Sequence, residues 1–379
     1  MVNRNYTNIS CKALGQLISL MGAASRSVSK NAVFNPDSRY YLPAIRLFIS
    51  LNFLVSTRDG KATDLLINDL ASEIHCCRKT VISSLKKLAS GNEPLISYHI
   101  DEETKLLSVE IINYTDMFKR AGEGGLRYLV FDKDLKDRLF TVKDINQMRV
   151  CLRAFLECEE QEGYEASLSV KQFMKALPDY IRPCNIREYL TINPAFLKAK
   201  PNVNKTSYHL SVSLISRVKD KRDRAYAENE SKIRKVIEDF NSNITFINDY
   251  NKDLDPAINA HTSVMVSNLL HVKFDWKKAQ ENQQKELPTF HFTTKEYEDA
   301  AQIATQLDFK SVKSALSKYM ETFVLTSRGS TRRDTMAIIQ NMSEAIFTKL
   351  HTYFDKPTEE DDIDFDFDTL DFSNAASAI

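Results

Sequence analysis

Apolar residues recur at helical spacing from Tyr40 onward. The recurrence runs through Leu42, Ile45, Leu47, Phe48, Leu51, Leu54 and Val55. It predicts one buried helix that ends near Ser56–Gly60. The short apolar run Leu65–Ile67 indicates a strand, and Asn68 suits the N-cap of a helix over Asp69–His75.

The pattern continues as a turn, a second helix and two strands around a polar turn. These elements are Cys76–Cys77, Arg78–Ser90, Leu95–Ile100, Asp101–Lys105 and Leu106–Ile112. Helical spacing places Val81, Leu85 and Leu88 on the buried face of Arg78–Ser90. The order is therefore helix, strand, helix, turn, helix and a pair of strands.

This order, with the run "LASEIHCCRKTVISSLKKL" inside it, resembles the winged-helix DNA-binding family over residues 40–113. The resemblance implies a helix-turn-helix whose second helix, Arg78–Ser90, is the recognition helix. It also implies that the following hairpin is a wing.

A weaker second copy of the order follows. Its expected elements are a helix at Asp144–Glu160, a strand at Ala166–Val170, a short helix at Lys171–Ala176, a helix at Asn185–Lys198 that Pro194 interrupts, a turn at 202–204 and a strand at Ser207–Ile215. Only the order of the elements is shared, because identity between the two copies is not evident. We expect a second winged helix here.

The expected fold class is mainly α with small β-hairpins (α+β), as two winged helices in tandem followed by a helical domain. The expected parts are an N-terminal arm at 1–38, winged-helix domains at 39–120 and 121–216, a charged linker helix and loop at 217–255, a helical C-terminal domain at 256–355 and an acidic disordered tail at 356–379.

Basic and hydroxyl side chains gather on the outward positions of the expected recognition helix. They are Arg78, Lys79, Thr80, Ser83, Lys86 and Lys87. Residues near the N-terminus of such a helix reach base edges, and later lysines suit phosphates. In the second copy, the DNA-binding candidates are Arg187, Lys198, Lys200 and Lys205, the three lysines marking an acid-free second wing. The acidic turn Asp101–Glu103 of the first wing opposes DNA contact.

Charge is distributed unevenly along the chain. It has 51 basic and 51 acidic residues, but eight acids and no base lie within 358–379. The rest of the chain therefore carries a formal net charge of +8. A basic body suits nucleic acid. In the tail, acids alternate with apolar residues that we expect to bind a partner: Phe365, Phe367, Leu370 and Phe372. That partner is either a replication protein or the chain's own basic body, while a solubilising tail is the alternative.

The sequence predicts no enzyme. Nine glycines in 379 residues argue against a Gly-rich nucleotide-binding loop, and the seven dispersed histidines support no metal site. We expect no cofactor. The six cysteines form no disulfide framework, which favours reduced thiols and a cytoplasmic protein. No signal peptide or membrane span is evident, so no membrane partner is expected.

Two winged helices followed by a helical region resemble the tandem winged-helix replication initiators of plasmids and phages. The resemblance implies sequence-specific binding of double-stranded DNA at origin repeats, recruitment of replication proteins and homodimer formation through remaining surfaces. Two alternatives stay open. One is a transcription regulator whose residues 257–354 dimerise, and the other is an adaptor whose winged helices bind proteins.

Overall fold

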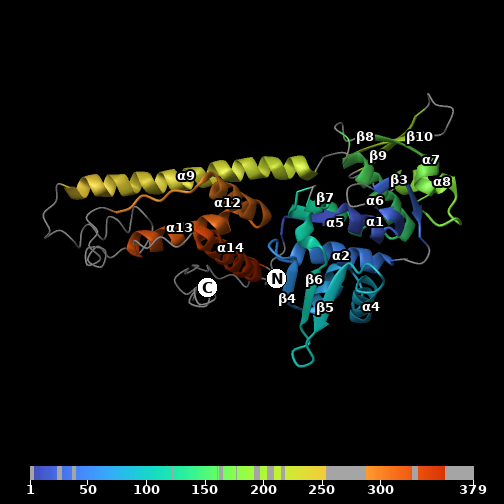
Figure 1. Ribbon diagram of the computed structural model, residues 1–379, viewed down its shortest axis with the longest axis horizontal. Helices are drawn as coiled ribbons and strands as arrows, with labels where there is room; N and C mark the ends of the chain where they lie inside the picture. The colour runs from blue at the N-terminus through green and yellow to red at the C-terminus, as the bar shows by residue number, and fades with distance from the viewer. Residues whose placement is uncertain are drawn as a thin grey trace. The chain divides into compact units, whose positions relative to one another are not determined.

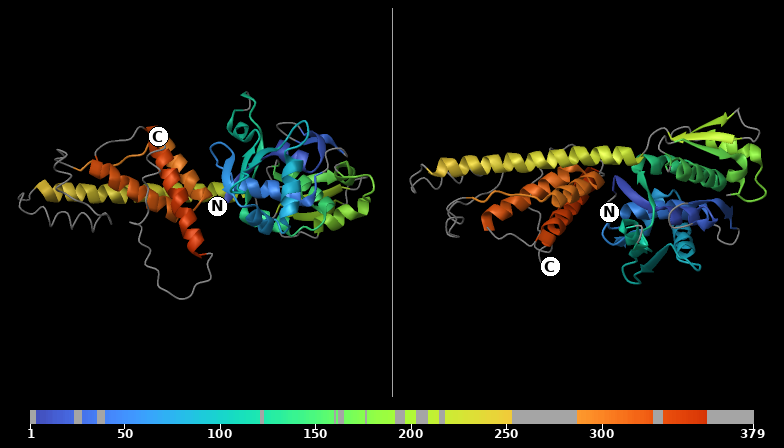
Figure 2. Two further views of the ribbon diagram at one scale, coloured as in Figure 1. Left: turned by 90° about the horizontal axis from the view of Figure 1, so that it is seen from below. Right: turned by 45° about the horizontal axis from the view of Figure 1, so that its top comes forward.

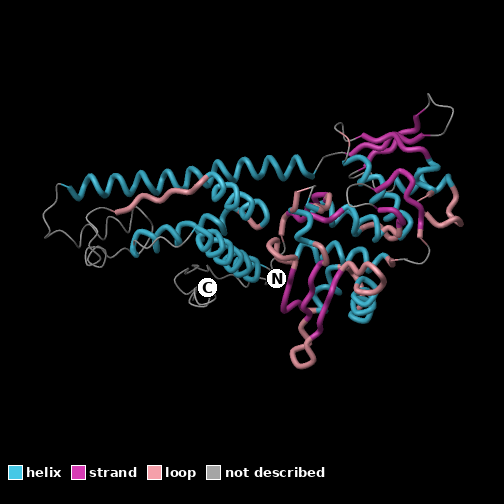
Figure 3. Tube along the Cα trace, in the orientation of Figure 1, coloured by secondary structure: helices cyan, strands magenta, loops and turns pink. Residues whose placement is uncertain are grey.

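The protein divides into two compact units, Asn3–Lys221 and Arg222–Ile379. The computed structural model describes residues 4–23, 28–35, 40–120, 123–159, 161, 165–175, 177–191, 197–202, 209–214, 218–252, 287–326 and 332–354. Within these residues the fold is mainly α-helical with small antiparallel sheets, and the strands lie in the first unit (Figures 1 and 3).

Residues 4–23 and 28–35 form a folded part of the first unit, so the expected N-terminal arm is wrong. They form β1 (Tyr6–Ser10), α1 (Cys11–Leu17), β2 (Leu20–Ala23) and β3 (Val28–Phe34). Strand β1 pairs antiparallel with the distant β7 (Tyr128–Asp132). The physical reason is burial, because Ile9, Leu14 and Leu17 are all fully buried. The Ser10 hydroxyl also caps α1 by accepting a hydrogen bond from the Ala13 amide.

The first repeat, residues 42–111, has the element order expected from the sequence. It comprises α2 (Leu42–Leu54), β4 (Lys61–Leu65), α3 (Ile67–Glu73), α4 (Arg78–Leu88), β5 (Ile96–Ile100) and β6 (Leu107–Ile111). The sheet order is β4-β6-β5, and a short 3-10 helix, η2 (Tyr114–Phe118), follows. Asn68 is not the N-cap of α3, because that helix already begins at Ile67 to bury its side chain.

The second repeat, residues 145–214, follows β7 and α5 (Lys133–Phe140) and shows the same order. It comprises α6 (Ile145–Glu159), β8 (Glu165–Ser169), α7 (Val170–Met174), α8 (Pro183–Thr191), β9 (Leu197–Asn202) and β10 (His209–Leu214). Its sheet order, β8-β10-β9, matches that of the first repeat strand for strand. Figures 1 and 2 show the two sheets at opposite ends of the first unit.

Two boundaries in the second repeat differ from the sequence prediction. Helix α8 spans Pro183–Thr191 rather than Asn185–Lys198. Proline suits the first turn of a helix, where its missing N–H has no helical acceptor to lose. Residues 197–202 form strand β9, where we expected the end of a helix and then a wing turn. The strand alternates buried Leu197 with exposed Lys198, which is the pattern of a half-buried strand.

One continuous hydrophobic core joins β1, α1 and both repeats. Helix α6 belongs to this core, and its residues 146–159 are all buried. One pair of buried charged side chains lies within it: Arg153 contacts Glu157 at 2.7 Å one turn later. Pairing of this kind offsets the cost of removing charge from water.

The second unit is built on the long helix α9 (Val218–Lys252), followed by α12 (Thr294–Gln306), α13 (Phe309–Thr326) and α14 (Arg332–Phe354). Most of the expected charged linker helix and loop, 217–255, is one helix, because α9 runs on to Lys252. Ile244 extends the buried stripe of Ile233 and Ile237 by two turns.

Two asparagines explain why the polar end of α9 is helical. Asn241 donates to the carbonyl of Phe290 and accepts from its amide, both at 2.8 Å. Asn248 does the same with Leu287 at 2.9 Å. Seven helical residues rise about as far as three extended ones span, roughly 10 Å. The extended segment 287–290 therefore lies in register along the helix.

Candidate nucleic-acid interface

Helix α4 presents a basic face that bears no acid. Its apolar face is fully buried, with Val81, Leu85 and Leu88 at 0% exposure, as the spacing predicts. The opposite face therefore points to solvent, and Arg78, Lys79 and Lys86 are exposed. Within the described part of the chain, none of these three cations has an ion-pair or hydrogen-bond partner for its side chain. Their charges are available to an external anion.

The N-terminus of α4 carries a set of short polar side chains. The Sγ of Cys77 lies 3.2 Å from the Oγ1 of Thr80. Ser83 donates its hydroxyl to the carbonyl of Thr80 at 3.0 Å, which leaves the oxygen of Ser83 as an acceptor on the surface. Thr80 and Ser83 are thus held in place beside the basic side chains of Arg78 and Lys79.

Lys87 differs from the other lysines of α4. Its side chain is half-buried, and its Nζ lies 5.7 Å from the centroid of the Tyr40 ring. A cation over an aromatic face is partly satisfied within the fold. Of the predicted contacts on this helix, Lys87 is therefore the least free to reach a ligand.

The turn between β5 and β6 is acidic and internally bonded. The Oδ1 of Asp101 accepts hydrogen bonds from the Glu103 and Thr104 amides and from the Thr104 hydroxyl. These bonds, led by the one from the Thr104 amide, hold the pKa of Asp101 below its usual range. The turn therefore keeps its negative charge, and it repels a phosphate backbone.

The second repeat brings fewer of the predicted residues together. Lys198 and Lys200 are exposed on β9, in register with Ser213 and Ser211 of β10. They share one face of the sheet, although they precede the tip of the hairpin. Lys205 lies outside the described residues.

Helix α8 can be compared with α4 by the positions of its buried residues. Buried Ile186 and Leu190 of α8 correspond to buried Val81 and Leu85 of α4, four residues apart in both helices. The side chain of Arg187 lies outside the described residues. The outward position next to it holds Glu188, an exposed acid.

Two residues at the start of α8 were missed by the sequence prediction. Tyr180 is 68% exposed, and Arg182 is exposed directly before the helix, where its amide donates to the side chain of Asn185. If Pro183 is taken as the first helical residue, Arg182 corresponds to Cys77, the residue directly before α4 in the first repeat. That assignment would have identified both residues from the sequence. They extend the set of candidate contacts.

The tail residues proposed to bind a partner lie outside the described part of the chain. They are Phe365, Phe367, Leu370 and Phe372.

The buried thiols of Cys151 and Cys158 lie in α6, where burial raises the pKa of each to about 12. Both thiols therefore pack in the hydrophobic core.

The described residues supply neither a metal-binding cluster nor a membrane span. No three of their His, Cys, Asp and Glu side chains group as a metal site would require. None of their helices is both long enough and apolar enough to cross a bilayer.

Comparison with known proteins gave no relative for this chain: no protein-family model and no curated protein matches it.

Proposed function

We propose that residues 42–111 and 145–214 are two winged helices in tandem and that the protein binds double-stranded DNA sequence-specifically. The observation that carries the proposal is the recurrence of one element order with one sheet order, β4-β6-β5 and β8-β10-β9. In the first repeat, the helix at the recognition position bears no acid and three cations that have no ion-pair partner among the described residues. This pairing of topology and charge suits the major groove.

Within this proposal, α4 supplies the main contact. Arg78 and Lys79 at its start suit guanine edges, and Thr80 and Ser83 suit bases or phosphates. Lys86 lies about 12 Å further along the helix and suits the phosphate backbone. The second repeat contributes Arg182, Tyr180 and the two lysines of β9.

The role that fits this architecture best is a plasmid or phage replication initiator that binds origin repeats and recruits replication proteins. In this proposal the chain performs no covalent chemistry and needs no cofactor. The second unit then serves dimerisation or recruitment. A transcription regulator would use the same DNA-binding parts.

A protein-binding adaptor is the second candidate, and specific observations favour it. The first wing has an acidic tip at Asp101–Glu103, where hydrogen bonds hold the pKa of Asp101 below its usual range, and α8 presents Glu188 where α4 presents Ser83. Both repel phosphate. In this candidate the repeats bind basic protein surfaces.

Charge reversal on α4 tests DNA binding directly. The double substitution Lys79→Glu and Lys86→Glu should abolish specific binding without unfolding the protein, because both side chains are exposed and unpaired. Each lost phosphate contact should also lower the slope of log affinity against log salt by roughly one unit. The measurement is a DNA titration at several salt concentrations, with DNA that flanks the gene.

The matched control is Lys143→Glu with Lys310→Glu, which makes the same change of net charge at exposed positions outside α4. Equal losses in both double variants would mean that only net charge matters, and the proposed face would be wrong. Footprinting separates the roles. Direct repeats beside AT-rich DNA identify an initiator, one palindrome over a promoter identifies a regulator, and no binding at low salt leaves the adaptor.

A further inference from the structure

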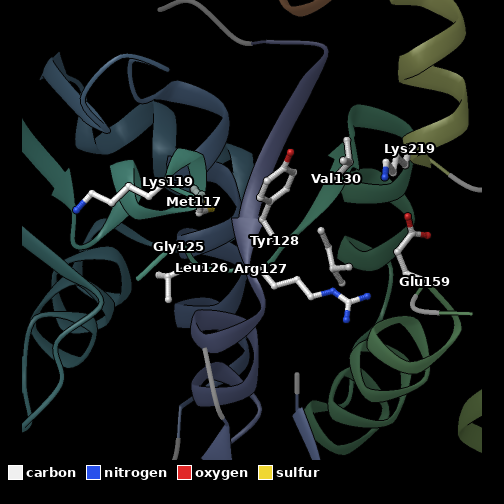
Figure 4. A pocket seen from close by; sticks show the side chains of 10 residues that line it. Met117, Lys119, Gly125, Leu126, Arg127, Tyr128, Val130, Glu159 and Lys219 are labelled. Carbon is white, nitrogen blue, oxygen red and sulfur yellow. The ribbon is translucent and has the colours of Figure 1, made fainter. Parts of the chain in front are cut away.

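A groove of about 520 Å³ runs along strand β7 in the first unit. A run of consecutive residues, 125–130, forms its floor, and Met117, Lys119, Glu159 and Lys219 form its walls. Figure 4 shows Met117 and Lys119 on one side of Tyr128, and Glu159 and Lys219 on the other. This volume lies within the range of ligand sites in proteins.

The floor of the groove is a free sheet edge. Strand β7 has β1 as its one partner among the described residues. The Arg127 carbonyl accepts from Cys11, and the Lys133 amide donates to Asn5, so the odd-numbered positions of β7 face β1. In an antiparallel pair the alternate positions face away. The backbones of Tyr128 and Val130 therefore point into the groove, and no described residue hydrogen-bonds them there.

The walls combine apolar and cationic surface. Buried Met117 and half-buried Leu126 offer apolar contact, and exposed Phe118 lies beside the Tyr128 ring with centroids 6.4 Å apart. Lys219 is exposed and has no ion-pair partner among the described residues. Lys119 is bound to Asp116, and Glu159 contributes one acid. Such a site favours an extended chain that is both acidic and apolar.

The chain itself contains a segment with this chemistry. Within residues 361–372, "DDIDFDFDTLDF", acids alternate with Ile363, Phe365 and Phe367 from Asp362 to Asp368. A period of two places the acids on one face of a strand and the apolar residues on the other. No base interrupts the segment, so it is complementary in charge to Lys219 and Arg127.

We propose that the groove binds the chain's own acidic segment, residues 361–372, as a strand added to the free edge of β7. The backbone groups of Tyr128 and Val130 then pair with the segment. Aromatic side chains pack on Phe118 and Leu126, and aspartates face Lys219. The proposal is independent of DNA binding, and it gives the alternating tail a defined binding site.

Hydrogen exchange in the full chain tests this directly. In the wild type, the amides of Tyr128 and Val130 should be protected. The charge-preserving double substitution Phe365→Ser with Phe367→Ser should speed their exchange roughly tenfold or more. The amides of Leu129 and Phe131 bond to β1, so their rates should not change. They report on whether the sheet itself stays folded.

Two further variants address the groove. Lys219→Glu should speed exchange at Tyr128 and Val130 as the tail variant does. Lys143→Glu should not, because Lys143 precedes α6 at the end opposite Glu159, about 22 Å away along the helix. A synthetic peptide of residues 361–372, added to the Ser variant, should restore protection, and a scrambled peptide should not.

Equal exchange at Tyr128 and Val130 in the wild type and the Ser variant overturns the proposal. So does failure of the peptide to protect these amides. Protection that survives the Ser substitutions would show that another segment or another protein fills the groove.

Discussion

At the residue scale, Cys77 is the most distinctive side chain of the candidate interface. It is exposed at the N-cap of α4, and its neighbour Cys76 is half-buried. The hydrogen bond with the Thr80 side chain is the main cause that lowers the pKa of Cys77. Burial is the main cause that raises the pKa of Cys76. The pKa values of these two adjacent thiols are therefore shifted in opposite directions.

This difference predicts selective alkylation. The thiolate is the reactive form, and a lower pKa gives a larger thiolate fraction at any pH near neutrality. Between pH 7 and 8, Cys77 should react with iodoacetamide faster than Cys76, as tandem mass spectrometry of the labelled peptide would measure. Thr80→Val should slow Cys77 by removing the bond. Equal rates at the two thiols would contradict the prediction.

At the scale of elements, Arg46 of α2 joins the two halves of the first unit. One of its Nη atoms donates to the carbonyls of Phe140 and Val142 at 2.7 and 2.8 Å, and the other to Ile74 at 3.4 Å. Ile74 begins the turn that leads into α4. The segment between α5 and α6 is therefore bonded, through one side chain, to the start of that turn.

Replacing Arg46 should weaken the first unit. Arg46→Leu leaves three partly buried carbonyls without their charged donor, so it should reduce the free energy of unfolding by about 2–4 kcal/mol. Urea denaturation would measure the loss. Arg58→Leu is the control, because Arg58 is exposed and should change stability by less than about 0.5 kcal/mol. Similar losses in both variants would argue against this role.

The elements predicted correctly from sequence are those stabilised by nearby residues. Helix α4 and the hairpin β5–β6 follow from local periodicity, and so do the helices of the second unit. Strand β1 was missed because its partner β7 lies more than 100 residues away, and no local pattern reports that pairing. Of the candidate site, the α4 face was predicted. Arg182 and Tyr180 were not, because their position depends on where α8 begins.

At the scale of the whole molecule, the two repeats share one hydrophobic core with β1 and α1. Strand β1 pairs with β7, which precedes the second repeat, so we expect that the first repeat does not fold alone. A chain ended at residue 120 contains every element of the first repeat but lacks β7. It should show no cooperative urea transition, whereas a chain ended at Lys221 should unfold cooperatively. Cooperative unfolding of the shorter chain would show that the repeat folds alone.

The β1–β7 pairing also sets an order of events during synthesis. Ser10 pairs with Tyr128, which is synthesised 118 residues later. A ribosome that adds about 5–20 residues per second needs roughly 6–24 s to reach it. Through that interval β1 has no partner, and both of its edges are open to other chains. The nascent protein is thus most exposed to aggregation at its very first strand, long before its functional surfaces exist. Slower translation before residue 128 should lower the soluble yield more than the same slowing after it.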